Sequence, residues 1–168
     1  YTLLLLLGSV LFVPGLAGIA RVTRAVSPRL TTIGTALAGY GMVVAVGDVM
    51  SQFTSWKAVG TGADRTQMIQ LFARIDDAAG VGLVFATGGI SFLVGSVLLS
   101  VALARSASVP SWAGVSFGVA MVLQLVGFSA SSIPLIAVSA LVALVAVVPV
   151  ARTLTGSAQR MPTAASLS

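Results

Sequence analysis

Residues 106–151 decide the fold: they read SASVPSWAGVSFGVAMVLQLVGFSASSIPLIAVSALVALVAVVPVA and carry no charge over 46 positions. An apolar helix crosses a bilayer in about 20 residues, so this run is too long for one span and must fold back. The break comes at Ser129–Ser132, just before Pro134. The stretch therefore predicts two membrane-spanning helices, over about 111–128 and 133–151.

The composition of the whole chain supports a membrane protein. Its 168 residues are 57% hydrophobic and only 8% charged, and the mean hydropathy is +1.07. A soluble domain has about a quarter of its residues charged, because its surface must be hydrated. A deficit of this size is typical of a surface that faces lipid.

Three more apolar stretches precede residues 106–151. They predict spans over about 2–20, 30–55 and 78–104, the first containing Pro14. Spanning segments without water must satisfy their backbone hydrogen bonds internally, which favours helices. The sequence therefore predicts an all-α, polytopic transmembrane helix bundle of about five spans.

The chain is expected to form one transmembrane domain over 1–152. Residues 153–168 are rich in Ser, Thr and Ala and predict a disordered tail. A signal peptide is the competing interpretation of the opening leucine run. A retained helix is favoured, because no basic segment and no clear small-x-small cleavage site come before Arg21.

Residues 57–77 form the one hydrophilic stretch of any size. Asp64 followed by Gln67 resembles a capping box at a helix start. Apolar residues then recur at helical spacing at Met68, Leu71, Phe72 and Ile75. The pattern predicts a short amphipathic helix on the membrane surface or against the bundle. An ordinary connector packed on neighbouring helices is the alternative.

The loop charges predict the orientation. One side collects Arg21, Arg24, Arg29, Arg105, Arg152 and Arg160. The other side has three basic residues, diluted by three aspartates. The positive-inside rule places the six arginines and the C-terminus in the cytoplasm, in a bacterial inner membrane. The net charge of +5 is scattered over short loops, so it does not predict nucleic-acid binding.

Asp48 is the one ionisable residue inside a predicted span. A buried acid in lipid is costly and suggests a function, here transport or proton relay. Gln52 lies one turn away and Gln124 at a comparable predicted depth, so the three could form a polar cluster. The alternative is that Asp48 joins helices through hydrogen bonds, within this chain or to another subunit.

Gly114 and Gly118 form a small-xxx-small pattern in the fourth predicted span. A similar stripe in the third span consists of Ser96, Ser100 and Ala104. Small residues let helices approach closely, either within the chain or against a partner subunit. The glycines of the third span predict that it is central and closely packed.

The residue types exclude most catalytic and metal chemistry. The chain has no histidine, cysteine or glutamate, and its acids are four aspartates. Zinc, haem and thiolate chemistry therefore lack their usual side chains. No glycine is followed by the Lys-Ser/Thr of a phosphate-binding loop. We expect no cofactor, no metal and no enzymatic activity.

Residues 93–128, LVGSVLLSVALARSASVPSWAGVSFGVAMVLQLVGF, resemble small polytopic membrane proteins of actinobacteria. The likeness consists of an apolar span that ends in Ala-Leu-x-Arg at Arg105 and a Val-Pro-x-Trp start to the next helix at Trp112. It covers about a quarter of the chain, and it implies no functional residue.

These features predict a non-catalytic accessory subunit of a larger inner-membrane complex, with other integral membrane subunits and the lipid bilayer as partners. In the actinobacterial setting that the resemblance implies, a lipid or fatty-acid import complex is one expected host and a respiratory complex is another. The alternative function is an autonomous, homo-oligomeric transporter or channel that uses Asp48. A lipid-modifying enzyme is a third and weaker reading.

Overall fold

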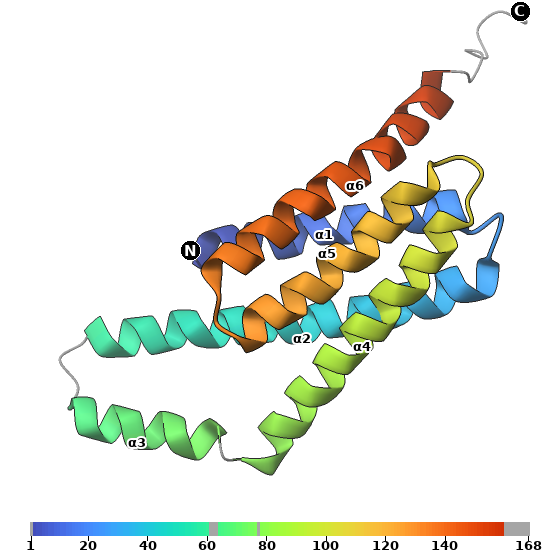
Figure 1. Ribbon diagram of the computed structural model, residues 1–168. Helices are drawn as coiled ribbons and strands as arrows, with labels where there is room; N and C mark the ends of the chain where they lie inside the picture. Colours follow the sequence, from blue (N-terminus) through green and yellow to red (C-terminus); the bar gives the residue numbers. More distant parts are fainter. Residues whose placement is uncertain (1, 61–63, 77, 160–168) are drawn as a thin grey trace, which may run out of the picture.

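The computed structural model describes residues 2–60, 64–76 and 78–159, and over these residues it is helical without strands. Its helices are α1 (Thr2–Thr23), α2 (Pro28–Gly60), α3 (Arg65–Asp76), α4 (Ala79–Ala104), α5 (Ser111–Ser129) and α6 (Ile133–Gln159) (Figure 1). The predicted all-α fold is confirmed.

Four helices are long and apolar enough to cross a membrane. Their apolar parts are Pro28–Ser51, Gly80–Ala104, Ser111–Ser129 and Ile133–Gly156, and they coincide with four of the five predicted spans. The remaining prediction falls on α1, a helix of 22 residues. Its part Val10–Thr23 forms a shorter apolar helix, so the fifth span stays a prediction.

The predicted break at 129–132 is a tight turn between α5 and α6. Ser131 has a φ of 51°, which is the left-handed conformation that commonly ends helices. The Ser132 N–H donates to the Gly127 carbonyl oxygen at 2.8 Å, and the Ser131 N–H donates to the Phe128 carbonyl oxygen at 3.1 Å. These two bonds satisfy carbonyls that the end of α5 would otherwise leave unpaired.

Two helices run further than the sequence predicts. α2 continues beyond Ser55 to Gly60, and α6 continues to Gln159. The disordered tail predicted over 153–168 is therefore wrong for its first seven residues, where no proline interrupts the helix. Thr153 and Thr155 even donate to carbonyls four residues back, at 2.9 and 3.1 Å. Residues 160–168 lie outside the described residues.

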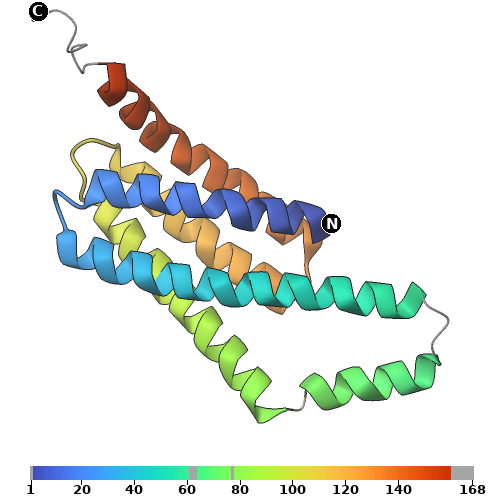
Figure 2. The same ribbon diagram turned by 180° about the vertical axis from the view of Figure 1, so that it is seen from behind.

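The five long helices pack as a ring with one diagonal contact. Over the described residues, α2 packs on α1 and α4, α4 on α5, α5 on α6, and α6 on α1, while α1 also contacts α4 (Figures 1 and 2). The apolar core lies toward the end of the bundle that holds the α1–α2 and α4–α5 turns. It is built from Leu16, Ile19, Leu99, Leu103, Val109, Ala113, Phe117, Ala120, Met121, Ala146 and Val150 together with Ala38.

Glycines bring α2 and α4 into close antiparallel contact. A Cβ added at Gly41 would lie 2.5 Å from the Phe92 Cβ, and one added at Gly88 would lie 2.6 Å from a Val44 methyl. A Cβ at Gly95 would meet the backbone of Ala38. The helices can approach this closely only without side chains at these positions. The close packing predicted for α4 is therefore found at Gly88 and Gly95, but nothing lies within 4 Å of a Cβ added at Gly80, Gly82 or Gly89, so the first half of α4 is not central.

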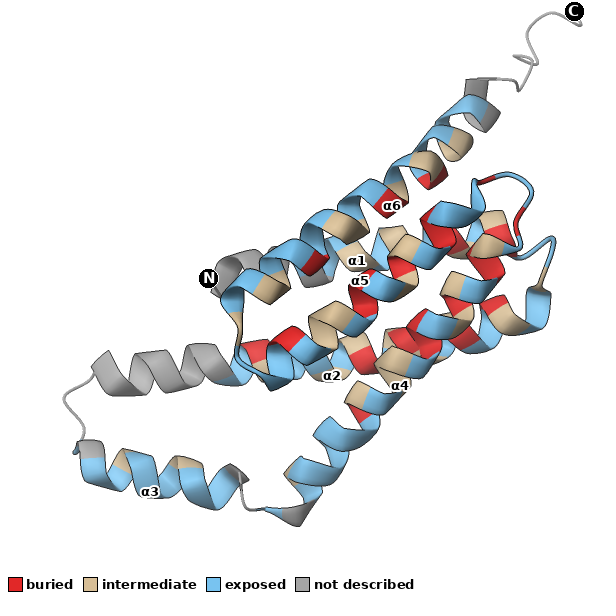
Figure 3. Ribbon diagram, viewed as in Figure 1, coloured by how far each residue is buried: buried red, intermediate tan, exposed pale blue. Residues whose placement is uncertain are grey.

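The other end of the bundle is open. α2 and α4 diverge there, and α3 joins their separated ends (Figures 1 and 2). The first half of α4 is largely exposed (Figure 3). Its large exposed apolar residues are Leu83, Val84, Phe85, Ile90 and Val94.

Candidate interaction site

The described arginines of the predicted cytoplasmic side gather at one end of the bundle. The α1–α2 turn, the α4–α5 turn and the last part of α6 lie together at that end (Figure 1). The exposed arginines there are Arg21, Arg24, Arg29, Arg105 and Arg152. α3 and the α5–α6 turn lie at the opposite end. The chain therefore has one basic, well-packed end and one open end.

Asp48 lies where α2 and α4 begin to separate. It is half-buried and lies within the apolar stretch Pro28–Ser51 of α2. Val44, one turn earlier, still packs onto Gly88 of α4. The Ser51 hydroxyl donates to the main-chain oxygen of Asp48 at 2.7 Å.

The structure does not bring Asp48 and Gln124 together. Over the described residues, α2 and α5 share no contact, so the polar cluster expected from their similar depth does not form between these two helices. The side chain of Gln52 lies outside the described residues.

Gln124 lies on the inward side of α5. It continues a stripe at helical spacing through the buried residues Ala113, Phe117 and Ala120 and on to Gly127. Its side chain is half-buried, at the point where the packed core gives way to the open end. Ser139 of α6 is also buried, and its hydroxyl donates to the Ile136 carbonyl oxygen at 2.8 Å.

Gly114 and Gly118 pack against α4 of the same chain. A Cβ at Gly114 would lie 2.8 Å from the Ala104 Cα, and a Cβ at Gly118 would lie 2.5 Å from the Ser100 hydroxyl oxygen. The Ser100 hydroxyl donates to the Gly114 carbonyl oxygen at 2.7 Å. Of the two uses expected for these glycines, the structure shows packing within the chain.

α3 begins where the capping pattern predicts. The Asp64 carboxylate accepts a hydrogen bond from the Thr66 N–H at 2.8 Å. Such a cap satisfies an amide that the first turn of a helix leaves unpaired. At the other end Arg74 lies in the last turn, where the helix dipole favours a cation. Both ends of α3 are therefore stabilised by side chains from its own sequence.

The surface of α3 mixes apolar and polar side chains. It packs on α2 and α4 only lightly; Met68 and Phe72 are half-buried. By contrast, Ile69, Leu71 and Ile75 keep 59%, 52% and 45% of their surface exposed. The predicted apolar face is therefore only partly covered by the chain itself.

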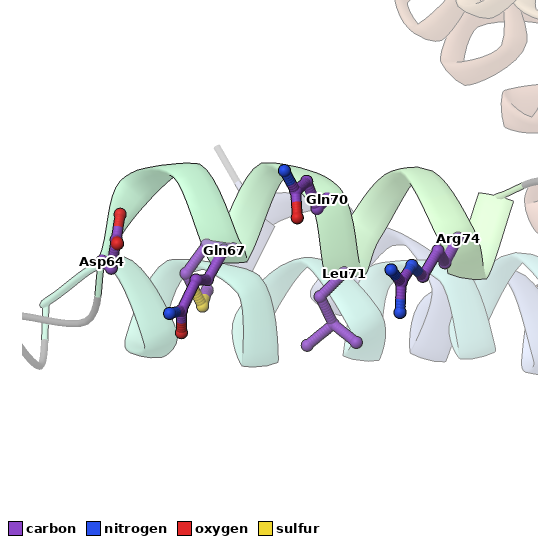
Figure 4. A pocket seen from close by; sticks show the side chains of 6 residues that line it. Asp64, Gln67, Gln70, Leu71 and Arg74 are labelled. Atoms are coloured by element: carbon purple, nitrogen blue, oxygen red, sulfur yellow. The ribbon is translucent and has the colours of Figure 1, made fainter.

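A shallow hollow of about 370 Å³ lies along one side of α3 (Figure 4). Gln67, Leu71 and Arg74 point to that side of the helix. The complete lining is Asp64, Gln67, Met68, Gln70, Leu71 and Arg74. It offers a carboxylate, two amides and a guanidinium beside an apolar floor, and we call it the α3 surface. Its exposed apolar part extends to Ile75, whereas Ile69 is exposed on the other side of α3.

The sequence pattern predicted that Leu71 and Ile75 lie on the apolar face of α3, but it missed two features of the fold. Ile69 lies off the main apolar stripe, although its spacing of three residues from Phe72 indicates a wider apolar arc. The pairing of α2 with α4 was also missed, although Gly34 and Gly41 repeat the seven-residue spacing of Gly88 and Gly95.

Metal-binding groups do not gather in the described part of the chain. No set of three or more His, Cys, Asp or Glu side chains lies close enough there to hold an ion. Comparison with protein-family models, with curated proteins and with solved structures found no match. The function must therefore be argued from the geometry of the chain itself.

Proposed function

We propose that this chain is a non-catalytic subunit of a larger bacterial inner-membrane complex and binds its partner through the open end of the bundle. The observation that carries the proposal is the α3 surface, where exposed apolar residues lie next to amides and charges. A lipid or fatty-acid import complex is the host that we expect.

The chemistry of the α3 surface fits a protein partner better than lipid alone. An interfacial helix that meets only lipid separates its apolar and polar residues onto opposite faces. On α3 the exposed Leu71 lies directly between Gln67 and Arg74 on one side of the helix. An apolar patch with polar groups at its rim is typical of protein interfaces.

The position of α3 makes it suitable for docking. It lies outside the four apolar stretches that can cross the membrane and spans the gap between the diverging ends of α2 and α4 (Figure 2). A partner helix at this end would also cover exposed residues of α4 such as Leu83 and Ile90.

The packing of the ring favours this function over transport by a single chain. The space between the helices is filled by Leu99, Leu103, Phe117 and Met121, which are all buried. These side chains make apolar contacts with one another between the helices. A polar pathway through the same space would need water or hydrogen-bonding groups. A transport route that used Asp48 would instead have to pass between copies of the chain.

The proposal is tested by purifying the tagged chain from its native membrane in a gentle detergent and identifying what accompanies it by mass spectrometry. We expect stoichiometric recovery of a defined set of integral membrane proteins. Leu71→Asp should lower that recovery by about tenfold, because a charge in an apolar contact costs more than ~1.4 kcal/mol.

Ala73→Asp is the matched control, because it adds the same charge to the opposite, exposed side of α3. It should leave recovery unchanged, and both variants should keep the helical circular-dichroism spectrum. Recovery of the chain alone, or only with itself, contradicts the proposal. It would direct attention to uptake by the reconstituted chain and its loss in Asp48→Asn.

A further inference from the structure

A second hollow of about 370 Å³ runs between α4 and α5, far from the α3 surface. It is open to the outside of the bundle, and we call it the α4–α5 groove. Its lining is apolar apart from one hydroxyl and consists of Val97, Ser100, Val115, Gly118, Val119, Val122 and Leu123. α4 and α5 lie side by side along it in both views (Figures 1 and 2).

The one polar side chain in the floor of the groove already uses its hydrogen-bond donor. Ser100 is its one polar residue, and the Ser100 hydroxyl already donates to the Gly114 carbonyl oxygen at 2.7 Å. Gly118 keeps the floor low, because a Cβ there would lie 2.5 Å from that hydroxyl oxygen. Valine side chains form both walls, so the groove presents a narrow hydrocarbon surface.

An exposed arginine lies beyond one end of the groove. On α4 the exposed stripe Val94, Val97 and Val101 leads at helical spacing to Arg105, which is also exposed. On α5 the exposed stripe that includes Val115 begins at Trp112. Because the helices are antiparallel, the arginine and the tryptophan lie at the same end of the groove.

The start of α5 adds further attraction for an anion at this end. The residue that precedes the helix is Pro110, which forms no side-chain cap, and the first turn contains no acid. The first amides of a helix and its dipole favour a negative group. The described acids Asp48 and Asp64 lie on α2 and at the start of α3, and neither lies on α4 or α5.

We propose that the α4–α5 groove binds one anionic phospholipid, with an acyl chain along the valine walls and the phosphate at Arg105. The groove and the cation match the two parts of such a molecule, and Trp112 is suited to the level of the lipid headgroups. Basic sites between transmembrane helices are known to select anionic headgroups. This proposal is independent of the partner that binds the α3 surface.

A lipid explains the groove better than a partner helix does. Helices in membranes associate through close backbone contact at small residues and through hydrogen bonds between polar side chains. Here Gly118 and Ser100 are already used by the contact between α4 and α5. The rest of the groove is apolar surface near Arg105. An amphiphile such as a phospholipid has an apolar chain for the one and an anionic group for the other.

Native mass spectrometry of the detergent-purified chain tests the proposal, with phosphatidylglycerol and phosphatidylcholine as probes. We expect a one-to-one adduct with phosphatidylglycerol that survives at lower lipid concentration than the phosphatidylcholine adduct. Arg105→Gln should weaken phosphatidylglycerol binding by about tenfold and phosphatidylcholine binding much less, because a charge-assisted contact to phosphate is lost.

Two further variants separate this site from general attraction to lipid. Val119→Trp should fill the groove and lower the occupancy of both lipids, while Leu141→Trp, at a 63% exposed position of α6, should not. Arg24→Gln removes a positive charge at the same end of the bundle and should leave binding unchanged. Equal losses in Arg24→Gln and Arg105→Gln, or unchanged binding in Val119→Trp, overturn the proposal. So does a Val119→Trp variant that loses a partner protein while it keeps the lipid.

Discussion

α2 lies directly against Gly95 of α4, which leaves room for no side chain larger than a hydrogen atom. An added Cβ would come within 2.7 Å of the Gly34 carbonyl oxygen and would also meet the backbone of Ala38. Gly95→Ala should therefore lower the free energy of unfolding by about 2 kcal/mol, since α2 and α4 must move apart. Thermal unfolding in detergent measures the change.

Gly89 provides the matched control for Gly95 on the same helix. Nothing lies within 4 Å of a Cβ added there, so Gly89→Ala should be neutral or stabilise the helix by about 0.5 kcal/mol. Equal destabilisation by both substitutions would show that α2 and α4 do not meet as described.

Ser131 adopts the left-handed conformation, with a φ of 51°. A side chain costs about 1 kcal/mol there, and glycine does not pay that penalty. Ser131→Gly should therefore raise the midpoint of thermal unfolding, and Ser132→Gly, which lacks the positive φ, should lower it. The opposite order of the two midpoints would contradict the turn that joins α5 to α6.

Single residues also show which positions and contacts can be predicted from sequence alone and which cannot. Counting along predicted helices put Asp48 and Gln124 at a similar depth, but depth does not tell which helices are neighbours. Gly114 and Gly118 signalled close packing correctly, but the sequence left open whether α4 or a partner provides the other surface.

At the level of elements, α3 depends on its cap. The Asp64 carboxylate accepts from the Thr66 N–H at 2.8 Å, so Asp64→Ala should destabilise the helix by about 1 kcal/mol. Hydrogen–deuterium exchange of residues 65–70 should become faster, while Asp64→Ser should restore most of the protection. Unchanged exchange in Asp64→Ala would mean that packing on α2 and α4, and not the cap, holds α3.

The starts and turns of the elements were predictable, and their far ends were less so. Pro28, Pro110 and the serines at 129–132 mark boundaries, because proline and left-handed residues interrupt helices. The ends of α2 at Gly60 and α6 at Gln159 lie beyond the predicted apolar limits. Hydropathy reports where a helix can contact lipid, whereas the helix itself continues until something in its sequence stops it.

For the whole molecule, the gathering of arginines at one end predicts a topology. The chain has no cysteine, so single cysteines can be introduced cleanly at exposed turn positions. Ala25→Cys and Ala107→Cys should react with a membrane-impermeant maleimide only from the cytoplasm, and Ala130→Cys only from the opposite side. Labelling of Ala25→Cys and Ala107→Cys from different sides would contradict the bundle.

The division of the molecule into a packed basic end and an open end is what the proposed function rests on. The most direct test is crosslinking in native membranes from a photoreactive residue placed at Leu71 of α3, with Leu141 of α6 as the control position; both are exposed, at 52% and 63%. We predict that Leu71 crosslinks to one defined membrane protein and that Leu141 crosslinks only to lipid. Crosslinks from Leu71 to lipid alone, or to another copy of the chain, would contradict the account.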